Sequence, residues 1–299
     1  MARPFALGLM AALLGNIIWG CFPFYFRELE SVSAIEILDH RIWASVVFML
    51  FWLPFGGRAS SVWTAITTPR SLALLTVTSA LIVGNWLVYI YTVTTEQVLQ
   101  ASLGYYLSPL IAVGLSWLVL RERQSSLQLI AVAIAVLSVA AKILVSGTVP
   151  TFALILAFSF SLYSLIHKQL DVGPISGLFI EACLALPFAL AHMAWLQSQG
   201  ELQFLFLATP QVNLFILGLG AVSIVPLYLF NLGAKALPLS LASMLFFLVP
   251  TLLFLFSVVF FGEALYWQDL IIFGGIWLAV GLYLAPYFQK SQKQGAVGA

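Results

Sequence analysis

The chain is a succession of apolar runs, each about as long as a bilayer is thick. Stretches of roughly 20 residues with few charges follow one another from Phe5 to Phe288, and charged residues, glycine and proline collect in the short breaks between them. Only 8% of the residues are charged, against about 25% in a typical soluble domain. A water-soluble fold of 299 residues has too little polar side chain to cover this apolar mass, so the bilayer must be the solvent.

Helices are the expected form of these runs, because lipid leaves each backbone polar group to be satisfied inside its own segment. We therefore predict an all-α integral membrane fold of ten transmembrane helices, at 5–26, 34–55, 71–93, 98–120, 125–146, 150–168, 174–196, 211–233, 237–261 and 266–288. The first run lacks a small-residue cleavage pattern, so we interpret it as a retained span and not a signal peptide.

Lysine and arginine predict the orientation, because they gather in cytoplasmic segments. With the N-terminus inside, the outer segments hold only Arg27 and Lys142, Arg41 lies within span two, and the inner segments hold Arg3, Arg58, Arg70, Arg121, Arg123, Lys168, Lys235, Lys290 and Lys293. We expect a multi-pass protein of the inner (cell) membrane with both termini in the cytoplasm.

An internal repeat organises the chain. Residues 101–122 read ASLGYYLSPLIAVGLSWLVLRE and residues 242–263 read ASMLFFLVPTLLFLFSVVFFGE, with a shared proline and a shared glutamate thirteen positions later. Five spans separate the copies, so they must run in opposite directions. We expect two inverted five-helix repeats, 1–146 and 147–288, before a short cytoplasmic tail, 289–299. Inverted repeats are typical of secondary transporters, which bind substrate near the midplane.

Several stretches together resemble the RarD-type permeases of the EamA branch of the drug/metabolite transporter (DMT) superfamily. They are IIWGCFPFYF, EILDHR, GNWLVYIYTV, ASLGYYLSP, the LRER closing span four, AFSFSLY, GLFIE and VPTLLFL…FFGE, and they extend from span one to span nine. The resemblance implies ten helices, cytoplasmic termini and a central cavity. Proteins of this type are described as presumed exporters of metabolites or drugs, without a defined substrate.

Charged residues open span two, where charge is costly and usually faces the bundle interior or a water-filled path. Glu36, Asp39, His40 and Trp43 share one helical face. Glu36 and His40 are our candidates for proton coupling, because a glutamate–histidine pair can change protonation near neutral pH. The alternative is that this patch is the solvated outer end of the span. Glu181, near the start of span seven, is a candidate counterpart of Glu36 in the second half; the alternative is that it lies close to the cytoplasmic surface.

Polar residues and polar-tipped aromatics inside the spans are candidates for lining a substrate cavity, since they can stack on a ligand and hydrogen-bond to it. The candidates are Asn16, Trp19, Asn85, Trp86, Tyr89, Ser102, Tyr105, Tyr106, Tyr163 and Phe246. Helix–helix packing is the alternative for Asn16, and an interfacial aromatic belt is the alternative for the aromatic residues.

Prolines in the repeated segment are candidates for hinges. Pro109 and Pro250 cannot donate a backbone hydrogen bond, so we expect each to kink its helix. The pair could serve alternating access, or the bends could be static. Glu122 and Glu263 each end a span, and an interfacial charge that closes a helix is the simpler interpretation of both.

These features predict a secondary transporter that works by alternating access, and the resemblance implies that it exports small metabolites or amphipathic drugs. Enzyme, metal-binding and phosphate-binding motifs are missing from the sequence, so we expect no catalytic residue, metal or cofactor. We expect a small-molecule substrate and membrane lipid as partners and no nucleic acid; the sequence leaves the oligomeric state unknown. A passive facilitator or channel, or an integral-membrane enzyme acting on lipid-linked substrates, are the alternatives.

Overall fold

The computed structural model describes residues 3–51, 53, 58–94, 98–146, 151–260 and 267–297, and these ranges hold helices and no strand. The helices are α1 (Arg3–Gly20), α2 (Phe22–Arg27), α3 (Ala34–Leu50), α4 (Arg58–Thr67), α5 (Pro69–Thr94), α6 (Val98–Val119), α7 (Ser126–Ser146), α8 (Thr151–Gln169), α9 (Pro174–Gln199), the irregular turn η1 (Gln203–Leu207), α10 (Pro210–Ala236), α11 (Leu239–Leu245), α12 (Leu248–Phe260) and α13 (Trp267–Val297).

Each expected span coincides with a helix or with two helices in series. The first is α1 and α2, interrupted at Cys21, and the ninth is α11 and α12, interrupted at Phe246 and Phe247. The short helix α4, between expected spans two and three, was not predicted. On length and composition five described segments can cross a membrane, namely 4–27, 69–92, 151–169, 174–207 and 210–236. The all-helical, multi-pass fold is confirmed, whereas the count of ten crossings stays a prediction.

Large apolar side chains cover much of the outer surface. Leu144 is 81% exposed, Phe188 78% and Leu137 69%. A soluble monomer rarely exposes contiguous apolar surface on this scale, so these faces are suited to lipid.

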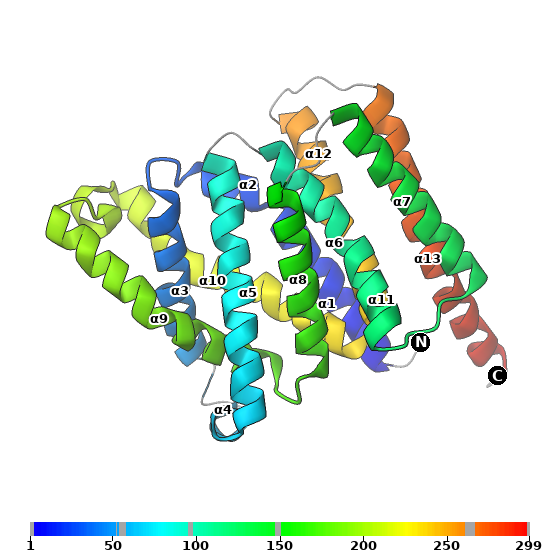
Figure 1. Ribbon diagram of the computed structural model, residues 1–299, viewed down its shortest axis with the longest axis horizontal. Coiled ribbons are helices and arrows are strands. Elements are labelled where there is room, and N and C mark those ends of the chain that lie inside the picture. The colour runs from blue at the N-terminus through cyan, green and yellow to red at the C-terminus, as the bar shows by residue number, and fades with distance from the viewer. Residues whose placement is uncertain are drawn as a thin grey trace.

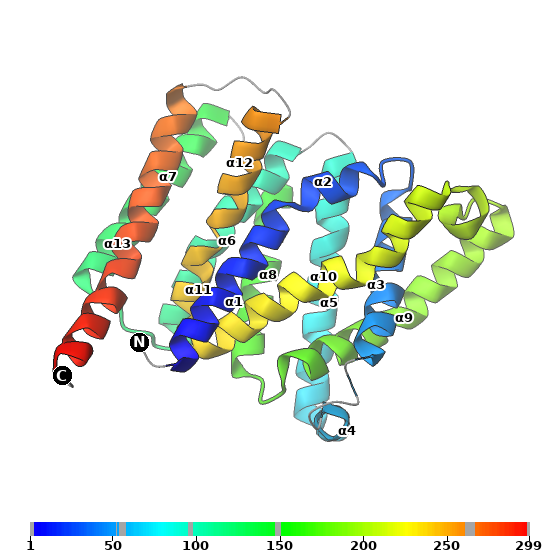
Figure 2. The ribbon, with the colours of Figure 1, turned by 180° about the vertical axis from the view of Figure 1, so that it is seen from behind.

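The helices stand side by side, with α7 and α13 paired at one end of the molecule and α3 and α9 paired at the other (Figure 1). Contacts between the halves come in matched pairs. The packing of α1 on α10 is matched by that of α8 on α5, and the packing of α6 on α8 is matched by that of α11 and α12 on α1. Helices that correspond between the two halves, such as α1 and α8 or α7 and α13, run in opposite directions (Figure 1 and Figure 2). The start of α1 and the end of α13 lie at the same edge of the molecule (Figure 1 and Figure 2).

At that edge, each of two lysines donates hydrogen bonds to carbonyl groups at the C-terminal end of the other lysine's helix. The Nζ of Lys168, at the end of α8, donates to the carbonyls of Ala234 (2.6 Å) and Leu237 (2.5 Å) at the end of α10. In return, Lys235 donates from α10 to the carbonyl of Leu170 just beyond α8 (2.9 Å). Cations here satisfy carbonyls that have no partner inside their own helices and complement the helix dipoles. This exchange holds α8 and α10 together.

The carboxylate of Glu122 caps the N-terminus of α11, the first of the two helices that form the ninth expected span. Glu122, just after α6, accepts from the backbone N–H groups of Leu239 (2.8 Å) and Ser240 (3.2 Å) and from the Ser240 hydroxyl (2.6 Å). It therefore supplies the acceptors that the first turn of α11 needs. Glu263 lies outside the described residues.

The tightest helix crossing joins α3 to α10 at Gly220. A Cβ placed on Gly220 would overlap the backbone carbonyl of Ala44, which cannot move as a side chain can. Only a residue without a side chain therefore allows this separation of the two helices.

We expect Gly220→Ala to destabilise the protein by about 1–3 kcal/mol, because the added methyl forces α3 and α10 apart. Thermal unfolding of the purified protein in detergent measures the effect. Gly84→Ala in α5 is the matched control, since a methyl group added there would have nothing within 4 Å. Equal melting temperatures for the two variants would contradict this account.

Candidate functional site

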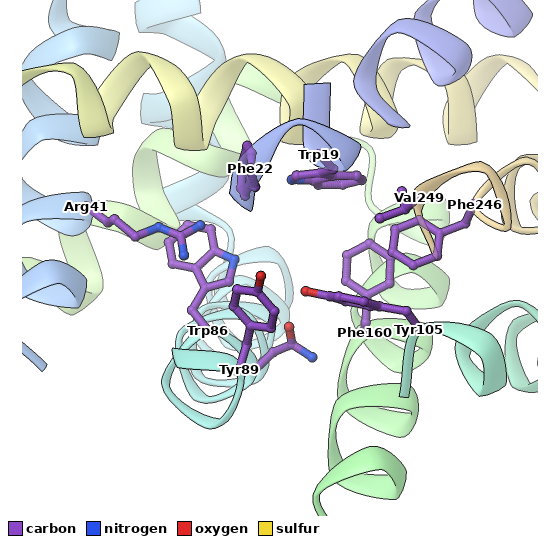
Figure 3. A pocket seen from close by; sticks show the side chains of 10 residues that line it. Trp19, Phe22, Arg41, Trp86, Tyr89, Tyr105, Phe160, Phe246 and Val249 are labelled. Carbon is purple, nitrogen blue, oxygen red and sulfur yellow. The ribbon is translucent and has the colours of Figure 1, made fainter. Parts of the chain in front are cut away.

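A cavity lies at the centre of the bundle, where helices of both halves meet (Figure 3). Its lining comes from α1, α2, α3, α5, α6, α8, α12 and the break between α11 and α12. The residues that line it are Trp19, Phe22, Arg41, Asn85, Trp86, Tyr89, Tyr105, Phe160, Phe246 and Val249. Most are aromatic, and among the described residues no aspartate or glutamate belongs to the lining.

Aromatic rings form one wall of this central cavity. Trp19 stands edge-on to Phe160 and Phe246, with ring centroids 5.8 and 5.7 Å apart, and the two phenylalanine rings are 5.1 Å apart. These are favourable separations for aromatic pairs. Facing this wall, Tyr89 and Tyr105 point their hydroxyls into the cavity (Figure 3), with ring centroids 5.6 Å apart.

The open volume of the cavity is about 40 Å³. One water needs about 10–15 Å³ by this measure, so there is room for roughly three waters. The aromatic side chains thus fill most of the space between the helices. This volume is smaller than an organic molecule, so binding one in the cavity would need helices or side chains to separate.

Arg41 is the one charged residue among the described residues of the cavity lining. It is 2% exposed, its guanidinium carbon lies 4.1 Å from the ring centre of Trp86, and Nε donates to the Ser223 hydroxyl (3.0 Å). Among the described residues, no carboxylate lies within 4.0 Å of it. A cation over an indole face is stabilised by the ring's negative face, and arginine stays charged at any physiological pH.

A second buried polar group lies on the other side of Trp86. Glu181 lines a smaller cavity that Trp86 also borders. Its Oε1 is 2.6 Å from Nε2 of His167, and its Oε2 accepts weakly from the Tyr163 hydroxyl (3.5 Å), which in turn accepts from Asn231 (2.9 Å). Among the described residues Nδ1 of His167 makes no hydrogen bond, so the ring has a free site for a second proton.

The Glu36–His40 pair has different partners. Glu36 Oε1 accepts from the backbone N–H groups of Gln203 (2.8 Å) and Phe204 (3.2 Å) in η1. His40 Nε2 lies 3.2 Å from the same oxygen, and Nδ1 accepts from the Trp43 indole N–H (2.7 Å). Accepting from Trp43 leaves Nδ1 without a proton, so the ring is neutral and donates from Nε2. This pair anchors η1 against α3, and neither residue lines the central cavity.

The third histidine joins α9 to α3. His192 Nδ1 is 2.5 Å from Asp39 Oδ2, and the aspartate side chain is 6% exposed. The chain has three histidines, and each is paired with a carboxylate.

Comparison with known proteins identifies the family. The model of the EamA-like transporter family matches residues 6–143 and again residues 148–285. The chain belongs to the EamA-like transporter family. A Vibrio cholerae protein named "Uncharacterized transporter" is 38% identical over 276 residues, which cover 92% of this chain and 91% of that protein. The protein named RarD in Escherichia coli is 34% identical, covering 95% of this chain and 96% of that protein.

More distant matches agree. A Pseudomonas aeruginosa protein named "Chloramphenicol-sensitive protein RarD" is 29% identical, covering 96% of this chain and 98% of that protein. One crystal structure, 18% identical, superposes with a TM-score of 0.71 over 94% of this chain and 96% of that one, and it shows a shared fold. The resemblance to RarD-type EamA permeases is thus confirmed, and the family and its relatives are named as transporters and not as enzymes.

Within this EamA-type fold, six of the residues expected from sequence line the central cavity. They are Trp19, Asn85, Trp86, Tyr89, Tyr105 and Phe246. Asn85 also ties α5 to α8, because its amide nitrogen donates to the Leu156 carbonyl (2.9 Å) and the Ser159 hydroxyl (2.8 Å). Their role in binding stays a prediction.

Other expected cavity residues lie elsewhere. Tyr106 is 1% exposed and packs beside Phe247 in the hydrophobic core, and Tyr163 belongs to the Glu181 network. Asn16 is fully buried outside the cavity lining, and neither of its amide atoms has a hydrogen-bond partner among the described residues. The side chain of Ser102 lies outside the described residues.

The two candidate hinge prolines have different surroundings. Pro109 lies within α6, which continues unbroken as one helix from Val98 to Val119. Pro250 lies in the first turn of α12, just after the break at Phe246, where a missing N–H leaves no helical hydrogen bond unmade. Hinge motion at either proline stays a prediction.

Sequence reasoning did not select Phe22, Arg41, Phe160 or Val249 as cavity residues. Arg41 was counted with the charged patch, yet it lies off the face shared by Glu36 and His40. The sequence did offer one indication of its role. Arg41 lies inside an apolar span and off the face of Glu36 and His40, and such an arginine needs a partner from another helix.

We expect Glu36→Ala to lower the stability by about 1–3 kcal/mol, since it leaves the amides of Gln203 and Phe204 without an acceptor. Glu36→Gln should retain most of the stability, because its side-chain carbonyl can accept the same bonds. Thermal unfolding of both variants in detergent measures this difference. An alanine variant as stable as the unmodified protein would show that the carboxylate does not hold η1.

Proposed function

We propose that the chain is a secondary transporter that exports small organic molecules through the central cavity by alternating access. The observation that carries the proposal is the cavity itself, which is narrow in this structure and lined by both halves of the chain. Secondary transporters place their substrate site between structural repeats near the middle of the membrane. Family membership supports transport, and the outward direction is part of the proposal.

The mechanism we propose is rocking of two inverted five-helix repeats, residues 1–146 and 147–288, around the cavity. The matched, oppositely directed packing of α1 and α8 supports this pairing. The cavity aromatics meet across the boundary between halves, so a small rotation separates Trp19 and Tyr105 of the first half from Phe160 and Phe246 of the second. In this scheme the membrane is the inner membrane, and both termini are cytoplasmic.

Two alternatives make different demands on the structure. A channel or passive facilitator would need a path that stays open, whereas this cavity holds only about three waters. An enzyme for lipid-linked substrates would need a nucleophile and a base at a membrane surface. Of the patch considered for that role, Glu36 is occupied by backbone amides and Asp39 by His192.

For the coupling proton, we propose Glu181 and His167 in place of Glu36 and His40. Among the described residues, no backbone N–H donates to the carboxylate of Glu181. Its partners are His167 and, weakly, the hydroxyl of Tyr163, so in this proposal it takes up a proton without releasing a loop. It also lines a small cavity that shares Trp86 with the central cavity, which supports a role near the proposed substrate site.

We expect purified protein in proteoliposomes to show saturable uptake and counterflow, in which unlabelled substrate inside accelerates entry of the labelled compound. A panel of amino acids, aromatic metabolites and chloramphenicol supplies the candidates. Counterflow requires a carrier that returns loaded, so linear, unsaturable flux without counterflow would indicate a channel. Conversion of a lipid-linked compound without flux would indicate an enzyme.

We expect Glu181→Gln to abolish accumulation driven by a pH gradient while counterflow at equal pH remains, because exchange needs no net proton movement. Proton movement, read with a pH-sensitive dye inside the vesicles, should be lost with it. Glu36→Gln and His40→Ala should keep both activities. Full pH-driven accumulation in Glu181→Gln would remove Glu181 from the coupling path, and its loss only in the Glu36 or His40 variants would restore the first hypothesis.

A further inference from the structure

Arg41 differs from the other buried or half-buried cations that the structure describes. Lys168 and Lys235 donate to backbone carbonyls, and each histidine lies beside a carboxylate. Arg41 has only the Ser223 hydroxyl and the rings of Trp86 and Phe26, which lie 4.1 and 5.6 Å from its guanidinium carbon. The guanidinium carries five N–H donors, and within the described ranges only Nε is hydrogen-bonded.

Burying a charge without a counter-charge is costly, and aromatic contact offsets only part of that cost. Such a charge is retained where it has a use, typically as the partner of a substrate or an ion inside the membrane. The guanidinium of Arg41 projects from α3 toward the cavity, above Trp86 (Figure 3). A ligand in the cavity is therefore the partner within its reach.

The other polar groups of the lining favour an anion as well. The hydroxyls of Tyr89 and Tyr105 point into the same space (Figure 3) and are hydrogen-bonded to each other. One O–H donates within this pair, so the pair keeps one O–H that can donate to a ligand. In the part of the chain that the structure describes, no aspartate or glutamate lines the cavity, so an ammonium group would find no counter-charge among those residues. The nearest carboxylates on α3, those of Glu36 and Asp39, are already paired with His40 and His192.

The opposite wall sets the shape of the rest of the ligand. Trp19, Phe160 and Phe246 present ring faces and edges at one end of the cavity, and Arg41 lies at the other. A flat apolar group can stack against these rings while an acid group reaches the guanidinium. Carboxylates fit the planar guanidinium fork through two parallel hydrogen bonds.

We propose that Arg41 is the anion-binding residue of the cavity and that the substrate is a small aryl carboxylate carrying a net negative charge. This inference rests on the transport function proposed above and names its substrate class. It predicts that a simple aromatic acid binds more tightly than the corresponding zwitterionic amino acid, and more tightly than neutral or cationic compounds with the same ring.

A ligand series of constant shape tests the claim. The compounds are 3-phenylpropanoate, 3-phenylpropanamide, phenylalanine and phenethylamine, which keep a phenyl ring on a two-carbon chain and change only the charged groups. Binding to the full-length protein in detergent is measured by the rise in melting temperature with ligand concentration, which follows from mass action. Counterflow of each labelled compound in proteoliposomes is measured alongside.

Three variants assign the effect to the guanidinium. We expect 3-phenylpropanoate to bind at least about tenfold more tightly than the amide, and Arg41→Gln to remove that preference. Arg41→Lys should retain a part, because an ammonium keeps the charge and loses the two-point geometry. Arg70→Gln, at an exposed position at the start of α5, is the control and should change nothing. A merely structural Arg41 would instead weaken all four ligands equally.

The outcomes separate this inference from the proposed function. Equal or tighter binding of the amide or the amine, no binding of the acid, or an unchanged acid preference in Arg41→Gln would overturn the anion site. If the favoured compound still shows counterflow in those cases, the transporter proposal stands alone. Arg41-dependent binding of the acid without counterflow of any compound would keep the anion site and remove the transport function.

Discussion

The low polarity of the bilayer forces each charged or polar group among these helices to find its partner inside the protein. The described residues meet this demand with pairs that also hold the fold. Lys168 and Lys235 satisfy the ends of each other's helices, Glu122 satisfies the start of α11, and Asp39 joins α3 to α9 through His192. Asn16 and Arg41 depart from this pattern among the described residues. The amide of Asn16 has no hydrogen-bond partner, and Arg41 lies in the lining of the central cavity with no described carboxylate within 4.0 Å.

Helix α3 concentrates this chemistry because consecutive residues on a helix point to different sides. Glu36 and His40, four residues apart, hold η1, while Arg41, one residue further on, projects into the cavity. A movement of α3 would therefore shift the η1 segment and the guanidinium together. Gly220 brings α10 close against the same helix, which couples α3 to the second half of the chain.

The two halves are similar in packing but not in detail, and the differences lie at the cavity. Helix α6 continues through Tyr105 and Pro109, whereas the equivalent segment of the second half is interrupted at Phe246, before Pro250. The interruption places the Phe246 ring among Trp19, Phe160 and Tyr105. An asymmetric cavity, with hydroxyls and a cation toward the first half and apolar rings toward the second, suits a ligand with one polar end.

Sequence alone determined the helical membrane fold, the order and approximate ends of the helices, the family and most of the cavity aromatics, because apolar run length and local motifs depend on neighbouring residues. Tertiary structure decided which polar side chains meet, because those partners come from helices distant in sequence. Glu36, a candidate for proton coupling from sequence, accepts hydrogen bonds from backbone amides more than 160 residues away. Glu181 lies beside His167 of the preceding helix. Helical periodicity placed Arg41 off the charged face. Only the packing of α3 against α5 and α10 brought its guanidinium over the ring of Trp86, where no described carboxylate lies within 4.0 Å of it.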